Sequence, residues 1–141
     1  VVYKDTINDF IIKGGVAHVD FKNNISWVTD TPEFFYEKDT VKLTGDTLKL
    51  IGDTLAIAIN NCVFQKGNSV CKACEVKYFV SGIEDSARIS KIEFTGTPIF
   101  TSLKKDGKDS LIGDYISVEI DSNEIKTIKI IGNVYGVRWA Y

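Results

Sequence analysis

The sequence contains no methionine, a single histidine and no long run of apolar residues. A transmembrane helix needs roughly 20 consecutive apolar residues, so we expect no membrane span. The 17 basic and 19 acidic residues give a net charge of -2, which argues against a nucleic-acid partner. Since the chain begins at Val1 instead of Met, we expect a processed product or an excised module, located extracellularly or at the cell surface.

Residue patterns typical of catalysis are also scarce. His18 is the only histidine, and no serine or cysteine stands in a nucleophile-elbow pattern. No glycine-rich phosphate-binding loop occurs either. A pair of glycosidase-type carboxylates stays open as an alternative, because acidic residues are plentiful. We therefore expect a protein that is not an enzyme.

Metal ligands are present but poorly arranged. Cys71 and Cys74 have the spacing of half a zinc site, whereas Cys62 stands alone and His18 is remote in sequence. Oxygen-rich turns at residues 106–109 and 121–124 could hold calcium, although neither matches an EF-hand loop, and such residues are common turn formers. We expect no cofactor, with a structural calcium ion as the alternative.

The three cysteines also suggest a disulfide. One bridge plus one free thiol is the simplest arithmetic, and pairing Cys62 with Cys71 or Cys74 would close a loop of about ten residues. The odd thiol could then link two subunits. The alternative is three reduced thiols.

Residues 40–59 show the clearest strand pattern in the chain. Asp-Thr dipeptides recur every seven residues, and alternating runs are separated by Gly45-Asp46 and Gly52-Asp53. Such pairs are typical of two-residue hairpin turns, because glycine tolerates a positive φ. A single long strand with a glycine bulge at Gly52 is the competing interpretation.

The hairpin registers predict one apolar sheet face. Folding about Gly45-Asp46 places Leu43 opposite Leu48, and folding about Gly52-Asp53 places Leu50 opposite Leu55. Directly opposed residues share a face of the sheet. The predicted face consists of Val41, Leu43, Leu48, Leu50, Leu55, Ile57 and Ile59.

A further hairpin is predicted about Gly132-Asn133, with Ile130 opposite Tyr135. Trp139 and Tyr141 would continue its apolar face and cap the core. Residues 81–88 are the only stretch that could form a helical turn. These patterns predict an all-β protein: an antiparallel, jelly-roll-like β-sandwich of about 10–12 short strands, forming a single domain over residues 1–141. A partly open barrel is the alternative.

The aromatic residues give the functional hypothesis. A hairpin at Asn23-Asn24 pairs Asp20 with Trp27, so Trp27 shares a polar face with His18, Asp20 and Lys22. An indole face stacks on the apolar side of a sugar ring while polar groups bond its hydroxyls. A one-residue register error would return Trp27 to the core. Tyr36 and Phe35 form the next candidates for this surface.

We therefore expect a non-catalytic extracellular module that binds a glycan or polysaccharide. The alternative is a structural subunit of a filament, pilus or virion-type assembly of identical subunits. In that case the apolar strand at residues 1–10 would be donated to a neighbouring sheet, or the odd cysteine would link subunits.

Overall fold

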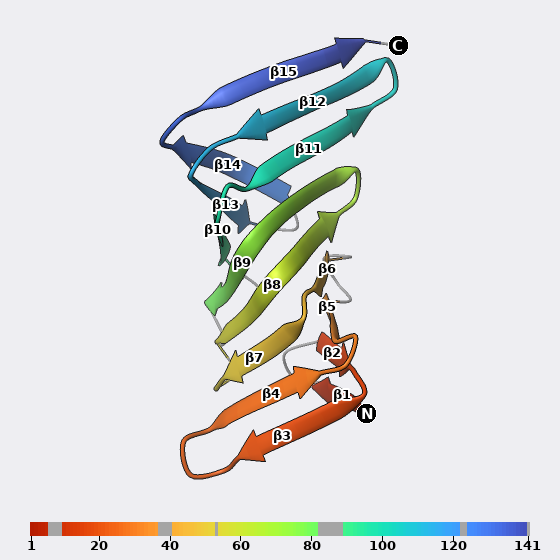
Figure 1. Ribbon diagram of the computed structural model, residues 1–141, viewed down its shortest axis with the longest axis vertical. Helices are drawn as coiled ribbons and strands as arrows, with labels where there is room; N and C mark the ends of the chain where they lie inside the picture. The colour runs from red at the N-terminus through yellow and green to blue at the C-terminus, as the bar shows by residue number, and fades with distance from the viewer. Residues whose placement is uncertain (6–9, 37–40, 53, 82–88, 122–123, 141) are drawn as a thin grey trace.

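The computed structural model describes residues 1–5, 10–36, 41–52, 54–81, 89–121 and 124–140 (Figure 1). These residues form fifteen strands, all paired antiparallel, and contain no helix, hence none long and apolar enough to cross a membrane. The all-β expectation is confirmed, although the strands outnumber the predicted ten to twelve. Residues 82–88, where a helical turn was considered, lie outside the described ranges.

The strands follow one another along the chain as β1 (Val2–Asp5), β2 (Phe10–Lys13), β3 (Val16–Asp20), β4 (Ile25–Thr29), β5 (Glu33–Tyr36), β6 (Val41–Thr44), β7 (Thr47–Ile51), β8 (Leu55–Lys66), β9 (Ser69–Ser81), β10 (Ile89–Thr95), β11 (Ile99–Lys104), β12 (Gly107–Ile112), β13 (Tyr115–Asp121), β14 (Glu124–Ile131) and β15 (Tyr135–Ala140).

The two longest strands, β8 and β9, divide the sheet into two halves. Residues 55–59 of β8 pair with β7, and residues 63–66 pair with β6. Residues 69–72 of β9 pair with β11, and residues 75–81 pair with β10. Half I therefore runs in the order β3-β4-β7-β8-β9-β10-β13-β14, and half II in the order β1-β2-β5-β6-β8-β9-β11-β12-β15.

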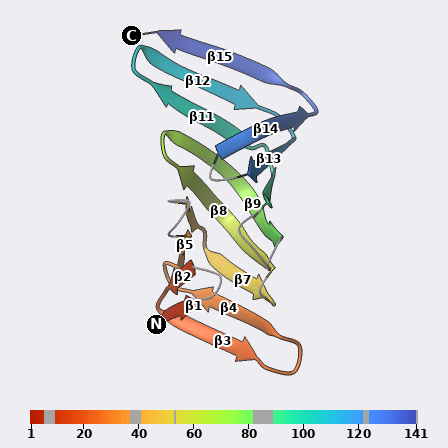
Figure 2. The same ribbon diagram turned by 180° about the vertical axis from the view of Figure 1, so that it is seen from behind.

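The two halves cross and face each other. In Figure 1 the strands β3, β4 and β7 lie in front of β1, β2 and β5 at the lower end, whereas β11, β12 and β15 lie in front of β13 and β14 at the upper end; Figure 2 shows the reverse. Ring pairs join the halves: Phe34 meets Tyr78 at 5.7 Å, and Phe64 meets Phe94 at 5.4 Å between ring centroids. The core lies between the inner faces.

Tight corners carry the chain from one half to the other. The backbone N–H of Asp46 donates to the carbonyls of Ile59 and Asn60, at 3.1 and 2.9 Å. The N–H of Asp114 makes the same pair of bonds to the carbonyls at 131 and 132. Asn60 and Asn61 have φ values of 60° and 52°, a left-handed conformation that asparagine tolerates better than most residues. Strand β8 can therefore bend without losing its partner β9.

Two of the predicted hairpins are wrong. Strands β6 and β7 flank Gly45-Asp46 but pair with different halves of β8, and β14 and β15 flank Gly132-Asn133 but pair with β13 and β12. A glycine followed by a short polar residue suits a corner as well as a two-residue turn. Sequence-distant strands supply the hydrogen bonds here, so the local turn signal does not decide the pairing.

The hairpin at Gly52 exists, but its register is one residue from the predicted one. Leu50 lies opposite Ala56 instead of Leu55, and Leu48 lies opposite Ala58. A shift of one residue moves a strand's side chains to the other face. The side chains of Leu55, Ile57 and Ile59 therefore lie on the outer face, whereas Val41, Leu43 and Leu48 are buried as predicted.

Trp139 does not cap the core. Trp139 on β15 is 45% exposed and lies on the outer face, with the Lys108 ammonium 4.8 Å from its ring centroid. Tyr141 lies outside the described residues.

No disulfide forms among the cysteines, so that expectation is wrong. All three thiols are free: Cys62 and Cys71 are buried in the core, and Cys74 is exposed. The Cys62 thiol donates to the carbonyl of Cys74 at 3.3 Å. Burial raises the pKa of both the Cys62 and the Cys71 thiol to about 12, so neither forms a reactive thiolate at neutral pH.

We expect Phe64→Ala to lower the free energy of unfolding by about 3–5 kcal/mol, because its fully buried ring leaves a cavity between the halves. Phe35→Ala, on the outer face, removes a half-exposed ring that contacts two lysines and should cost about 1 kcal/mol. Urea unfolding measures both, and equal losses would contradict the position of the core.

A thiol reagent should modify Cys74 rapidly in the folded protein and leave the other two cysteines unmodified. In urea all three should react, because unfolding removes the burial that protects Cys62 and Cys71. Mass spectrometry of the alkylated protein counts the labels. Fewer than three labels in urea without reductant would indicate a disulfide after all.

Candidate functional site

Inward side chains of half I align in two rows across the strands. The pairing registers join each residue to its directly opposed neighbours. The row beside the corners consists of Ala17, Val28, Leu48, Ala58, Val76, Phe94, Ile116 and Ile130. The second row consists of Val19, Ser26, Leu50, Ala56, Tyr78, Ile92, Val118 and Ile128. Half I thus presents an almost wholly apolar inner face.

Half II has one apolar row and one mixed row. The row beside the corners consists of Tyr3, Ile12, Phe34, Leu43, Phe64, Cys71, Phe100, Leu111 and Gly136. The mixed row, which is also on the inner face but lies nearer the turns, consists of Phe10, Tyr36, Val41, Lys66, Ser69, Ser102, Asp109 and Arg138. This mixed row is apolar on β2, β5 and β6 and polar from β8 to β15.

The apolar rows end uncovered at both ends of the molecule. In the described residues the edge strands β1, β3, β14 and β15 each pair with one neighbour, and Figure 1 places β3 and β15 at opposite ends of the long axis. The middle of each row is fully buried, whereas its end residues are not: Tyr3 is 54%, Val19 48% and Ile128 37% exposed. Water therefore reaches apolar inner surface at two mouths.

A charged cluster occupies the polar end of the mixed row. The Asp109 carboxylate accepts from Lys104 Nζ at 2.6 Å and from Arg138 Nε at 2.8 Å. These hydrogen bonds, Arg138 first and then Lys104, lower the pKa of Asp109 to about 2. A cavity of about 130 Å³ adjoins the cluster, lined by these three residues with Asp106, Gly107, Lys108 and Trp139. The cluster joins β11, β12 and β15.

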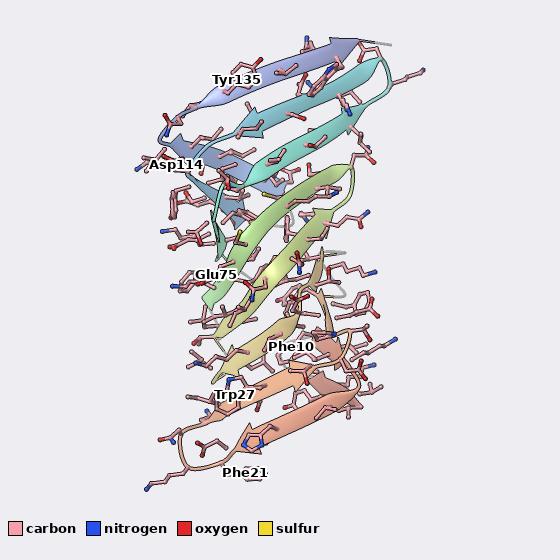
Figure 3. The ribbon with its side chains drawn as sticks, viewed as in Figure 1. Phe10, Phe21, Trp27, Glu75, Asp114 and Tyr135 are labelled. Carbon is pink, nitrogen blue, oxygen red and sulfur yellow. The ribbon has the colours of Figure 1, made fainter. Side chains whose placement is uncertain are left out.

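The predicted surface residues are only partly brought together. The His18 and Trp27 rings lie 5.5 Å apart on the outer face of half I, and the Lys49 ammonium is 5.7 Å from the Trp27 ring. Figure 3 labels Trp27 near the lower end of the molecule. Trp27 pairs directly with His18 instead of Asp20, a shift of two residues that keeps the predicted face. Trp27 is half-buried between its neighbours.

Asp20 and Lys22 have other roles. The Asp20 carboxylate accepts from the backbone N–H groups of Lys22 and Asn23 and from the Asn23 side chain, which closes the turn. The Asn23 hydrogen bonds lower the pKa of Asp20. The adjacent Phe21, at the tip of the same turn, is 91% exposed.

The aromatic pair after this hairpin divides between the two faces. Tyr36 is buried in the core with its ring 6.1 Å from that of Tyr78. Phe35 lies on the outer face of half II, where Lys13 and Lys42 flank its ring at 5.5 and 5.6 Å. A shallow hollow of about 560 Å³ opens beside it.

Metal ligands do not gather in the described part of the chain. No three His, Cys, Asp or Glu side chains there lie close enough to hold an ion. Asp109, from one of the candidate calcium turns, is engaged by two cations. In the other turn, residues 122 and 123 lie outside the described ranges.

The charged cluster and the uncovered mouths were not predicted from the sequence. Asp109 and Arg138 are 29 residues apart and meet only because β12 pairs with β15. The alternation of β11 carried a partial signal, since Phe100, Ser102 and Lys104 fall on one face.

No known protein family matches the sequence, and no curated protein matches it. Among solved structures, the chain is similar to LptH from Pseudomonas aeruginosa, described as the LptA-homologous periplasmic component of the lipopolysaccharide transport device. The TM-score is 0.71 at 10% sequence identity, and the match covers 92% of this chain and 97% of that one. The two proteins therefore share a fold.

This likeness overturns the expected function. The extracellular glycan-binding module and the alternative of a filament, pilus or virion-type subunit are wrong, because the chain shares its fold with a protein described as a periplasmic component of a lipopolysaccharide transport device. Strand β1, which falls within the segment expected to be donated, pairs with β2 of the same chain. The described part of the chain is thus similar over nearly its whole length to LptH, an LptA-homologous component of a lipopolysaccharide transport device.

Proposed function

We propose that this chain is a non-enzymatic, extracytoplasmic carrier that holds the acyl chains of an amphiphilic lipid against its inner face. The observation that carries the proposal is the exposure to water of inward-facing apolar side chains at the two mouths, namely those of Tyr3, Val19 and Ile128. Residues 1–141 would act as one jelly-roll-like domain. The likeness to LptH favours a glycolipid such as lipopolysaccharide as the cargo and the periplasm as the location.

The energetics favour this use of the mouths. Exposed apolar surface normally marks a binding site, because leaving it in water is unfavourable. Each methylene of an acyl chain buried there contributes about 0.8 kcal/mol, so the gain grows with the length of chain that the mouths cover. An acyl chain at a mouth would meet the partly exposed end residues of these rows, because the middle residues are already buried between the halves.

We further propose that copies of this chain associate end to end, so that the mouth formed by β1 and β3 in one copy meets the mouth formed by β14 and β15 in the next. The edge strands β1 and β3 at one end, and β14 and β15 at the other, offer unpaired backbone groups to a neighbour. Exposed apolar residues gather on these strands, including Val2, Val16, Ile131 and Tyr135. Stacked copies would continue both halves and cover the mouths.

A photoreactive side chain tests the cargo site. With p-benzoylphenylalanine at Ile128, which points inward, illumination should cross-link purified lipopolysaccharide to the protein. The same group at Lys129, the next residue and outward-facing, should cross-link far less. Val19 and His18 form an equivalent inward and outward pair on β3 at the other mouth. Equal labelling at the members of each pair would contradict an internal cargo site.

Sedimentation velocity tests the end-to-end contact. We expect the sedimentation coefficient to rise with protein concentration, and Tyr135→Lys on edge strand β15 to weaken association by about tenfold, since a lysine would be desolvated in the contact. Ile99→Lys is the matched control, because Ile99 is also exposed but lies on β11, which has a neighbour on each side. An unchanged coefficient for the wild type at all concentrations would remove the proposal.

A further inference from the structure

We propose that Lys104 and Arg138, on the inner face of half II, bind the anionic phosphate headgroup of the carried amphiphile. The inference rests on the proposed function and assigns the class of cargo: a phosphorylated lipid whose acyl chains lie on the adjacent apolar row. The headgroup would sit at the inner rim beside the β11–β12 turn, towards the mouth formed by β14 and β15 (Figure 1).

The first support is the position of these charges. Arg138 lies opposite Asp109, and Asp109 lies opposite Ser102, in the same inward row that contains Phe10 and Tyr36. Charged residues seldom point towards a core, because desolvation is costly. Here they stand at its rim, where 71% of the Arg138 side chain and 44% of that of Lys104 remain exposed.

The second support is the balance of charge. Two cations share one carboxylate, so Lys104, Asp109 and Arg138 together carry one net positive charge. Asp109 engages Arg138 through Nε at 2.8 Å and through one terminal nitrogen at a longer 3.4 Å. Guanidinium offers five N–H donors and ammonium three, so both cations keep donors for a phosphate oxygen. The hydroxyl of Ser102 lies in the same row.

The third support is the spacing between polar and apolar rows. Leu111 follows Asp109 by two residues on β12, and Phe100 precedes Ser102 by two on β11. Two residues along a strand span roughly 6.6 Å, so the polar and the apolar row are immediate neighbours. A headgroup on Lys104 and Arg138 would thus lie beside the apolar row at Leu111, which is only partly buried.

The competing interpretation is that the cluster only clamps β11, β12 and β15 together. Two variants separate these roles, because they change phosphate affinity in opposite directions. Lys104→Gln with Arg138→Gln removes both cations, whereas Asp109→Asn leaves both cations without their shared carboxylate. Either variant weakens a clamp.

The experiment measures binding of diphosphoryl lipid A and of its dephosphorylated counterpart to the full chain. We expect the wild type to prefer the phosphorylated lipid by about tenfold, the K104Q/R138Q variant to lose that preference, and D109N to increase it. K77Q/K91Q is the matched control: it removes two lysines that are each ion-paired to a glutamate on the outer face of half I. Its preference should equal that of the wild type.

Each result has a distinct meaning. If the wild type binds both lipids equally, or K104Q/R138Q keeps the preference, the headgroup site is wrong while the carrier function stands. If D109N and K104Q/R138Q both lower the preference, the cluster is a clamp and the site is wrong. If neither lipid binds the wild type, the carrier function itself fails. Displacement of lipid A by an equal concentration of inorganic phosphate would overturn the assignment to an amphiphile.

Discussion

The bend in the β8–β9 hairpin is the constraint on which the rest of the structure depends. Asn60 and Asn61 adopt left-handed backbone conformations, and the register of the pair shifts there between Ile59 and Cys62. Before the bend β8 pairs with β7, and after it with β6. Each half of the sheet therefore continues from its own part of this hairpin. The corner between β6 and β7 lies at the bend as well, because the N–H of Asp46 donates to the carbonyls of residues 59 and 60. Without the bend the two inner faces would form one flat surface with no enclosed core.

The rows of inward side chains, and therefore the candidate site, follow from that bend. Antiparallel pairing keeps opposed residues on one face, so a row that starts at Phe64 on β8 continues through Leu43 to β1 and through Cys71 to β15. A closed barrel would cover the ends of such rows, but here edge strands terminate them. The uncovered ends are thus built into the architecture and are not isolated surface residues. That distinction is what gives the exposed Tyr3, Val19 and Ile128 a common explanation.

The sequence identified the strands far better than their partners. Alternation located β4, β7 and β13 because each has one face towards the core, and it also located β3, although the inward residues of β3 are exposed at a mouth. Trp27 was placed on the correct face because the register error of the hairpin was two residues, and a shift by an even number keeps the face. At Gly52 the error was a single residue, which reversed the faces of Leu55 and Ile57. Corners at Gly45-Asp46 and Gly132-Asn133 carry the residues of a two-residue hairpin, so local chemistry could not tell them apart. The partners of β6, β14 and β15 are distant in sequence, and the Asp109–Arg138 contact was lost with them.

The mixed row makes the two ends of the molecule different. Strands β2, β5 and β6 present Phe10, Tyr36 and Val41 in this row, whereas β11, β12 and β15 present Ser102, Asp109 and Arg138. An amphiphile lying on this face would bind most favourably with its headgroup near β15, because the reversed orientation would place a charged group over apolar side chains.

The two mouths also differ from each other, since β1 and β3 form one and β14 and β15 form the other. A contact between two copies that continues both halves must therefore join unlike ends. Contacts between unlike surfaces generate chains rather than closed pairs, and a row of such copies would hold every lipid in the same orientation.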